Sequence, residues 1–403
     1  MTADVVIVGG GVIGSCAAYY LARAGAEVVV IDPAPGNGAS KGNAGLIVPS
    51  YALPMSNPDL LLSGVRSLFG DDPAATLGRP LSLRTLVWLS RFALASRPGR
   101  AWRDAVRLRE LADASRRLYD ELAPDVPVRT AGLLHLARDE RTWRSERRTA
   151  ERLAAIGVRS EELDPAALVR VEPGLADGFA GAIHFPDDGA LDPERTFAAI
   201  AAAAVRHGAV YRQATVTGVV RFGRRVAAVK TDRGLVGGRT FVIAAGARSA
   251  RVGRLFGVRL PVEAAYGWSL TVPTAGPLLA HAAVCADEHV AINAGPDRVR
   301  LTGGMEFGGR ATDGPDPQAV AALREAAERA VPALADVEDP GTPWRGARPM
   351  TPSGLPVIRA VGDNVIAATG HGTLGMTLGP ATGRIVEHLV RWPQSSPRFA
   401  RPR

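Results

Sequence analysis

A strand, a glycine-rich turn, a helix and a second strand open the chain. Residues 4–8 (DVVIV) predict a buried parallel strand, and Gly9, Gly11 and Gly14 follow it in the spacing GxGxxG. Residues 12–24 repeat apolar side chains at helical spacing, and residues 27–31 predict a second strand that ends at Asp32. A β-α-β unit of this kind points a helix N-terminus at a phosphate group. The sequence therefore predicts an α/β domain that binds a dinucleotide.

Each residue of this motif has a physical role. We expect Gly9 to make the turn, Gly11 to let the backbone approach a pyrophosphate, and Gly14 to let the helix pack closely on the strand. Asp32 is expected to accept the ribose hydroxyls. The same site is predicted to include the neighbouring residues Val12, Ile13 and Pro33.

Two observations favour FAD over a nicotinamide cofactor. Residues 240–246 (TFVIAAG) predict a strand that ends in small residues, as is expected where a strand passes close to a bound dinucleotide. No second GxGxxG follows a strand, so no separate nicotinamide domain is predicted. We expect this returning part of the domain to contact FAD through Val216, Ala245 and Gly246.

Three further segments carry a family resemblance: residues 39–54 (ASKGNAGLIVPSYALP), 344–358 (WRGARPMTPSGLPVI) and 370–389 (GHGTLGMTLGPATGRIVEHL). They resemble the D-amino-acid dehydrogenase branch of the FAD-dependent D-amino-acid oxidase superfamily, which includes glycine oxidase and sarcosine oxidase. The resemblance implies oxidation of a D-amino acid, glycine or an N-substituted amino acid to its imine. Residues 265–269 (AYGWS) depart from the Lys-Gly-Tyr-Ser pattern that is frequent in these dehydrogenases.

The resemblance also implies a fold and a domain order. We expect an α/β architecture in which a Rossmann-like FAD-binding domain of the glutathione-reductase type is interleaved with an α+β substrate domain, built on a mainly antiparallel sheet. The FAD-binding domain is predicted to comprise residues 1–56, 190–258 and 344–403, and the substrate domain residues 57–189 and 259–343. Strand-like runs at 130–137, 180–186, 266–272, 290–293 and 298–304 are assigned to the substrate domain.

Two loops are expected to lie against the flavin. By resemblance, the first lies along the pyrophosphate and the flavin face, with Ser40, Lys41, Asn43, Ala44, Gly45 and Leu46 as contacts. The second precedes a C-terminal helix expected to begin within residues 378–383, whose N-terminus would face the side of the flavin that gains negative charge on reduction. Its predicted contacts are Gly372, Thr373, Leu374, Gly375, Met376 and Thr377.

An arginine is the expected anchor for the substrate carboxylate, because its planar guanidinium matches both oxygens. Arg348 matches the carboxylate-binding arginine of the glycine oxidase relatives, and Arg345 is the local competitor. Tyr51, Tyr266, Trp268 and His371 are predicted to line the pocket around it.

The charge distribution leaves one question open. The chain has a formal net charge of +8, and nine arginines against three acids lie within residues 84–117, among leucines and tryptophans. This segment either lies on an anionic membrane surface, which suits transfer of electrons to a membrane quinone, or packs on the substrate domain with solvated arginines. No nucleic-acid-binding motif is present, so no nucleic acid partner is predicted.

Cysteine usage and the chain start narrow the remaining alternatives. Cys16 and Cys285 have no metal-ligand or redox spacing and match no flavin-tethering position of the family, so we predict noncovalent FAD and no metal. Residues 1–10 enter a strand without a basic leader, and no apolar run reaches the ~18 residues of a membrane span. We therefore expect a cytoplasmic location, peripheral on the inner face of the membrane at most.

Three functions remain compatible with the sequence. The first is the amino-acid oxidation above, with oxygen or a quinone as electron acceptor. The second is oxidation of a 2-hydroxy acid, which an arginine anchor serves equally well. The third is a flavin-binding subunit without independent turnover.

Overall fold

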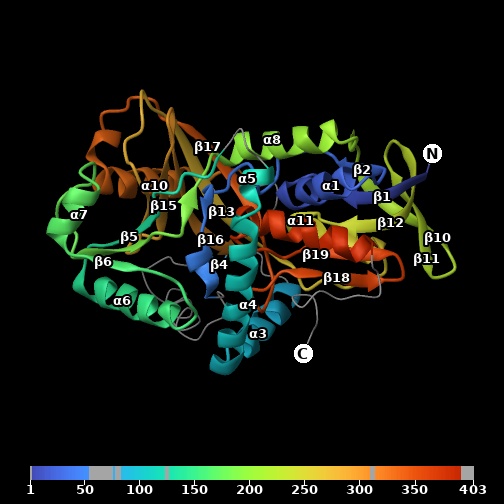
Figure 1. Ribbon diagram of the computed structural model, residues 1–403, viewed down its shortest axis with the longest axis horizontal. Coiled ribbons are helices and arrows are strands. Elements are labelled where there is room, and N and C mark those ends of the chain that lie inside the picture. Colours follow the sequence, from blue (N-terminus) through green and yellow to red (C-terminus); the bar gives the residue numbers. More distant parts are fainter. Residues whose placement is uncertain (1, 54–75, 78–82, 123–126, 309–313, 392–403) are drawn as a thin grey trace.

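The computed structural model describes residues 2–53, 76–77, 83–122, 127–308 and 314–391. It contains two large sheets side by side, with helices between and around them (Figure 1). The first sheet has eight strands and the second has nine, and a third sheet pairs only β3 (Leu46–Ile47) with β8 (Gly189–Ala190). Of the expected domain segments, residues 1, 54–75, 78–82, 123–126, 309–313 and 392–403 lie outside the described residues.

The first sheet is built on parallel strands buried on both faces. Its central path runs β10 (Val216–Phe222), β11 (Arg225–Thr231), β12 (Gly234–Ile243), β1 (Thr2–Val8), β2 (Val28–Asp32) and β9 (Val210–Gln213). β19 (Val365–Thr369) pairs in parallel with β12, and β18 (Val357–Gly362) pairs with β19 in antiparallel fashion. One face packs on α1 (Val12–Arg23), α8 (Pro193–Arg206) and α11 (Gly375–Arg391), and the other on the β10–β11 hairpin and α9 (Ser249–Leu255).

The predicted β-α-β unit is confirmed, with β1, α1 and β2 in the expected order. Gly9 has φ +114°, a conformation that L-residues with a side chain rarely adopt. A side chain at Gly14 would overlap the carbonyl oxygen of Gly9, so α1 can start this close to β1 only with glycine there. The motif glycines therefore shape the backbone as the sequence predicts.

The second sheet is mainly antiparallel, as expected. Its order is β17 (Thr342–Met350), β13 (Glu263–Pro273), β16 (Arg298–Phe307), β15 (Val290–Ala294), β14 (Ala282–Cys285), β5 (Leu133–Ala137), β7 (Gly181–Phe185) and β6 (Glu161–Leu163), with β4 (Thr76–Leu77) beside β16. β17 pairs with β13 along its whole length. β17 thus belongs to the second sheet, and we propose that the third segment of the first domain starts after Met350, where the sequence analysis placed its start at residue 344.

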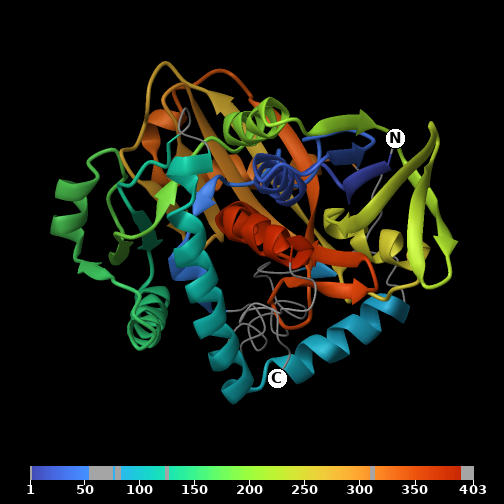
Figure 2. The same ribbon diagram turned by 45° about the vertical axis from the view of Figure 1, so that its right-hand side comes forward.

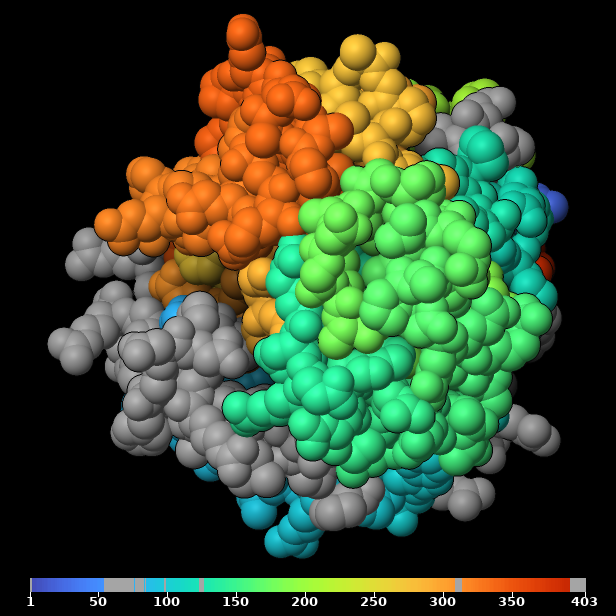
Figure 3. Space-filling view, turned by 90° about the vertical axis from the view of Figure 1, so that its left-hand side faces the viewer, coloured from blue at the N-terminus to red at the C-terminus, as the bar shows by residue number. Residues whose placement is uncertain are grey.

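Helices cover both faces of the second sheet on the side of the molecule away from the first sheet (Figure 1). α10 (Pro317–Ala330) packs its buried residues on β13, β15 and β16. α6 (Glu140–Ala154) and α7 (Pro165–Val171) cover the end that carries β5, β7 and β6. Figure 3 views this side of the molecule, where the green segment of α6 and α7 and the orange segment of α10 form most of the surface.

α11 begins at Gly375, earlier than the predicted start within residues 378–383. Pro380 lies inside the helix and has no N–H to bond the carbonyl of Met376, four residues earlier. The hydroxyl of Tyr119, on α5 (Tyr119–Leu122), donates to that carbonyl instead. This bond satisfies the carbonyl that the proline leaves without a donor, and the helix continues past Pro380.

Two of the glycines near the C-terminus serve helix packing. A side chain at Gly383 would overlap the backbone of Cys16 on α1, and one at Gly379 would crowd the Cys16 sulfur at 3.3 Å. These glycines therefore let α11 cross α1 closely.

α3 (Leu83–Ala95) and α4 (Pro98–Arg116) diverge along the lower edge of the molecule (Figure 2). α4 packs on α11, whereas α3 lies beside the end of the second sheet that carries β13 and β17. Among the described residues, no helix combines the length and the apolar character needed to cross a membrane.

Candidate functional site

The N-terminus of α1 has the properties of a phosphate-binding site. Its N-cap is Gly11, which provides no side-chain cap, and only the hydroxyl of Ser40 lies near the space where a Gly11 side chain would stand. Ser40 Oγ accepts from the backbone N–H of Val12 at 3.0 Å. The following backbone donors and the positive end of the helix dipole fit the pyrophosphate of a dinucleotide.

Asp32 lies beside this helix end. Its two carboxylate oxygens accept from the N–H groups of Gly10 and Ala34, both at 2.8 Å. These bonds fix the carboxylate at the end of β2, where a ribose lies in dinucleotide-binding folds. The residues present therefore fit the ADP part of FAD.

Loop 41–45 lies between the two sheets and is held by side chains that the sequence analysis did not identify. Arg300 donates to the carbonyl oxygen of Lys41 at 2.7 Å, and Asn293 Nδ2 donates to that of Ala44 at 2.7 Å. The ring of Trp344 covers Gly42, where a side chain would overlap it. We call the face of the second sheet that carries these three side chains the cofactor face.

The second predicted flavin loop meets the first. Thr377 Oγ1 lies 3.2 Å from the N–H of Val48 and 3.3 Å from the carbonyl oxygen of Leu46, and bonds both. The side chain of Leu374 packs with Leu46 and Ala44. The two loops predicted from distant parts of the sequence therefore form one site.

His371 lies in the second loop and is 3% exposed. Its Nε2 contacts Thr382 Oγ1 at 2.9 Å, and that hydroxyl donates its own hydrogen to the carbonyl of Leu378. Nε2 must then carry the imidazole hydrogen, which leaves Nδ1 as an acceptor without a partner among the described residues. Burial lowers the pKa of His371 to about 3, so the ring is neutral.

Arg348 projects from β17 onto the cofactor face. Side chains alternate along a strand, and Trp344, Gly346 and Arg348 follow one another at intervals of two. The Arg348 guanidinium lies flat over Gly267 on β13, where any side chain would overlap it. It donates to the carbonyl oxygens of Gly303 and Gly304.

Arg348 has no carboxylate partner within the part of the chain that the structure describes. Burial lowers its pKa to about 10, which still leaves the guanidinium charged at neutral pH. A buried cation that lacks a counter-ion is costly to maintain unless a ligand supplies the negative charge. Arg348 is therefore placed to bind an anion on the cofactor face.

Arg345, Tyr266 and Trp268 lie on the opposite face of the same sheet. Arg345 stacks on the Tyr266 ring, 3.9 Å from its centre, and pairs with Glu306 at 3.5 Å. Trp268 packs with the α10 core. The structure therefore does not bring Tyr266 and Trp268 together with Arg348, and they stay predictions without a geometric basis in this site.

Tyr51 lies on the cofactor side, but beside strands β14 and β15, far across the sheet from β17. Its ring meets that of His135 edge to face with centres 5.5 Å apart, and burial raises the pKa of its hydroxyl. The neighbouring Ser50 donates through its N–H and its hydroxyl to Asp188.

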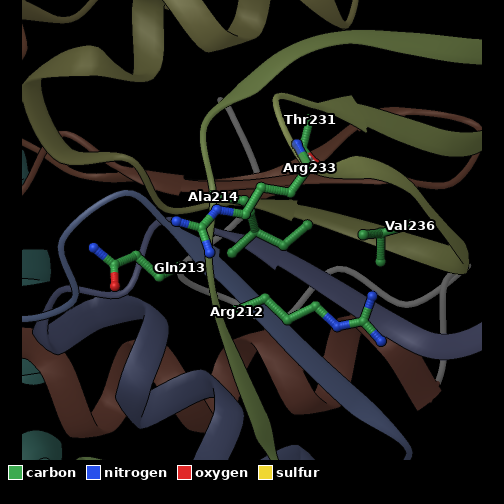
Figure 4. A pocket seen from close by; sticks show the side chains of 7 residues that line it. Arg212, Gln213, Ala214, Thr231, Arg233 and Val236 are labelled. Carbon is green, nitrogen blue, oxygen red and sulfur yellow. Dashed lines mark hydrogen bonds between the residues drawn. The ribbon is translucent and has the colours of Figure 1, made fainter.

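Val216, Ala245 and Gly246 lie at the ends of β9, β10 and β12, and Gly246 has φ +53°. A hollow of about 220 Å³ adjoins this region, lined by Ile31, Arg212, Gln213, Ala214, Thr231, Arg233 and Val236. Figure 4 shows Arg212 and Arg233 reaching toward it from β9 and from the turn before β12. Neither arginine was identified from the sequence, which carries no motif at these positions.

Comparisons with known proteins agree with this geometry. The chain is 36% identical to the D-amino acid dehydrogenase of Rhizorhabdus wittichii over 400 residues, which covers 96% of this chain and 95% of the relative. It is 33% identical to that of Paramagnetospirillum magneticum over 403 residues, or 96% and 94% of the two chains.

Solved structures share the fold. Glycine oxidase from Bacillus cereus superposes with a TM-score of 0.77 at 23% identity, over 98% of this chain and 96% of that chain. Glycine oxidase from Geobacillus kaustophilus gives a TM-score of 0.75 at 26% identity, over 97% and 95%. Residues 4–389 match the family described as FAD dependent oxidoreductase (DAO). The chain belongs to this family of FAD-dependent oxidoreductases.

Proposed function

We propose that the protein oxidises a free amino acid at its α-carbon, with FAD as the hydride acceptor and Arg348 as the anchor of the substrate carboxylate. The observation that carries the proposal is the buried, charged guanidinium of Arg348 on the cofactor face. The relatives named D-amino acid dehydrogenase support a D-amino acid as the substrate. The similarity to glycine oxidase from Geobacillus kaustophilus supports glycine as a close alternative.

Arg348 has donors left for a ligand. A guanidinium has five N–H groups, and the two bonds to Gly303 and Gly304 use one on each terminal nitrogen. The remaining donors can hold both carboxylate oxygens in a fixed plane. Fixing this plane determines the direction in which the α-hydrogen points, and such positioning is the main contribution a protein makes to hydride transfer.

The reaction removes a hydride from the α-carbon and one proton from the amine, which gives an imine; water then hydrolyses the imine to an oxo acid and ammonia. FAD, when bound, supplies the two-electron acceptor for the hydride. His371 is a poor candidate for the base that removes the proton, because its pKa of about 3 gives it little affinity for one. Its unprotonated Nδ1 is suited to accept a hydrogen bond from a bound molecule instead.

Anaerobic reduction of the flavin by single compounds tests the proposal. D-amino acids, glycine, sarcosine and the matching 2-hydroxy acids are mixed with the purified yellow protein, and loss of flavin absorbance is followed. Reduction by amino acids but not by hydroxy acids is the expected result. Reduction by hydroxy acids alone would favour the second function, and reduction by neither would favour a subunit without turnover.

We further propose that α3 and α4 contact an anionic membrane surface and that a membrane quinone accepts the electrons. The outer faces of these helices expose Leu83, Leu86, Val87, Leu94, Trp102 and Val106, each between 37% and 77% exposed. Arg91, Arg97, Arg100 and Arg103 are exposed beside them. Exposed apolar residues next to arginines suit the interface between lipid tails and anionic headgroups.

A hollow adjoins this surface. It measures about 320 Å³ and is bordered by Arg91, Leu94 and Arg100 on one side and by Thr351 on the other. Thr351 packs directly on Gly370, the residue before His371. Thr351 therefore lies between the hollow and the second flavin loop, and we propose that a lipid-soluble acceptor approaches the flavin from this side.

Flotation with vesicles of anionic phospholipid at low salt tests the membrane contact, because electrostatic attraction is strongest there. The parent protein should float, and the double variant Trp102→Ala, Arg103→Glu should stay unbound. Arg224→Glu is the matched control, since Arg224 is 89% exposed on the distant β10–β11 turn. Parent protein that stays unbound contradicts membrane contact, and reoxidation of reduced flavin by oxygen but not by a short-chain quinone contradicts the proposed acceptor.

A further inference from the structure

We propose that α3 and the cofactor face beside Arg348 form an apolar pocket for the substrate side chain, with Trp88 as its specificity-determining residue. The preferred substrates are then amino acids with apolar side chains larger than a hydrogen atom. This inference rests on the proposed function, because it takes the carboxylate to be bound by Arg348.

Strand register places the pocket next to the anchor. Arg348 on β17 pairs with Ala265 on β13, and Ala265 pairs with Phe307 on β16. Residues paired across antiparallel strands project to the same face, so these three form one row. Met350 follows Arg348 by two residues and projects to that face as well.

This row is part of one buried apolar cluster. Ala265, Met305, Phe307 and Met350 pack together with Trp88, and Leu89 and Phe92 of α3 complete the cluster. A substrate whose carboxylate lies on Arg348 therefore has an apolar wall on the α3 side. Glu263, which pairs with Met350 and accepts from Thr85 of α3 at 3.3 Å, is the acidic side chain beside this wall, and the rest of the cluster offers a polar side chain no partner.

The other side of Arg348 along β17 is already filled. There the Trp344 ring covers Gly42, and the next strands hold loop 41–45 through Arg300 and Asn293. A substrate side chain directed that way would collide with the loop that is predicted to lie along the flavin. The α3 side is therefore the direction left along this strand for a side chain.

Trp88 supplies the aromatic surface of this wall. It is 4% exposed, and its ring stacks on that of Phe92 and lies against that of Phe307, with centres 5.5 Å and 5.2 Å apart. Its indole N–H is buried without an acceptor among the described residues. An apolar side chain offers this N–H no acceptor, so the aromatic ring of Trp88 is the part that would contact the substrate.

The two methionines indicate how selective the pocket is. Met305 and Met350 are flexible and polarizable, so they can adjust to apolar groups of different shape. We therefore expect a preference for apolar character and size over one defined shape. An added methylene in a pocket of this type is worth roughly 10-fold to 200-fold in specificity.

The test measures anaerobic flavin reduction in stopped flow for glycine, D-alanine, D-leucine, D-phenylalanine, D-serine, D-lysine and D-aspartate. In the parent protein, the second-order rate constant should rise from glycine to D-leucine by at least about tenfold and be lowest for the charged side chains. Trp88→Ala should flatten the ranking, whereas Trp88→Phe keeps an aromatic wall and should retain it.

Two further measurements keep the result decisive. Ser90→Ala is the surface control, because Ser90 lies exposed on the same helix, and it should leave the ranking unchanged. Binding of phenylacetate, an apolar carboxylate, should perturb the flavin spectrum of the parent protein and weaken about tenfold or more in Trp88→Ala.

The failures are distinguishable. Parent protein that is active but prefers glycine, D-serine or D-lysine over D-leucine overturns the pocket and leaves the proposed function standing. The pocket is also overturned if Trp88→Ala keeps the substrate ranking of the parent protein. If Trp88→Ala does not fold, the parent ranking and its persistence in Trp88→Phe decide the question. A flavin that no amino acid reduces overturns the proposed function and the pocket with it.

Discussion

Arg345 and Arg348 lie three positions apart on β17, yet they project from opposite faces of the second sheet. Arg345 stacks on Tyr266 and pairs with Glu306 on the face that α10 covers. Among the described residues, Arg348 donates only to two backbone carbonyl oxygens, on the face that holds loop 41–45. One arginine is part of an ion pair within the protein, and the other retains charge and donors for a ligand.

The two arginines of this strand therefore have different roles: Arg345 supports the fold, and we propose that Arg348 binds a ligand. A charge paired inside the protein contributes to the stability of the fold, whereas a buried charge without a partner is maintained at a cost that binding can offset. The two arginines therefore predict opposite outcomes when each is removed.

The largest expected effect is the loss of turnover in Arg348→Ala. Removing one partner of a buried charge pair costs ~2–5 kcal/mol, so kcat/KM should fall roughly 30-fold to several thousand-fold. Arg348→Lys should recover little, because a point charge does not fix the carboxylate plane. Steady-state kinetics with FAD content measured in parallel tests this, and near-normal kcat/KM with full FAD content would refute the assignment.

Arg345→Ala should affect stability more than catalysis. Its removal leaves Glu306 without its salt-bridge partner, and we expect a loss of about 3 kcal/mol in the free energy of unfolding. Denaturant unfolding should register this loss, while kcat/KM changes by less than about threefold. If Arg345→Ala loses turnover and Arg348→Ala does not, the anchor lies on the other face.

Asp188 offers a test of the cofactor side by pH. Burial raises its pKa to about 6 from an ordinary 3.8, although Ser50 donates two hydrogen bonds to it. The folded state thus holds its proton more tightly, so the stability from this group is present below pH 4 and is lost as pH rises toward 6. The loss amounts to at most ~3 kcal/mol. Asp188→Asn should remove this pH dependence. The free energy of unfolding of both proteins is measured between pH 4 and 7, and an equal change with pH in parent and variant would contradict the prediction.

The smallest expected effect concerns the hold on loop 41–45. Asn293 donates to Ala44 and Leu191 and accepts from Arg129, so Asn293→Ala leaves several polar groups without partners. We expect FAD to dissociate about tenfold faster, with a shifted flavin spectrum. Asn364→Ala is the control, because Asn364 bonds the backbone of β11 and β12 far from the loop. Equal FAD release in both variants would indicate a general loss of stability.

The sequence by itself determined the β-α-β unit. The turn at Gly9, the close packing at Gly14 and the position of Asp32 depend on residues within one stretch of about 30, so their roles follow from local spacing. Five strands of the second sheet, β5, β7, β13, β15 and β16, were also predicted, because each has an apolar pattern of its own, whereas β4, β6, β14 and β17 were not. The segments that resemble known enzymes identified the family for the same reason.

Only the tertiary structure decided which side chains share a site. The pairing of β17 with β13 decides which arginine of β17 projects toward the flavin loops. Arg348 does so, whereas Arg345 lies on the other face with Tyr266 and Trp268. A shift of one residue in this pairing would reverse the faces of the two arginines. Arg300, Asn293 and Trp88 could not be identified beforehand, because their partners Lys41, Ala44 and Phe307 each lie more than 200 residues away in the sequence. Gly379 and Gly383 belong to no flavin loop, because the crossing of α11 over α1 requires them. Local patterns fix the elements, but the register and packing of distant segments fix the chemistry.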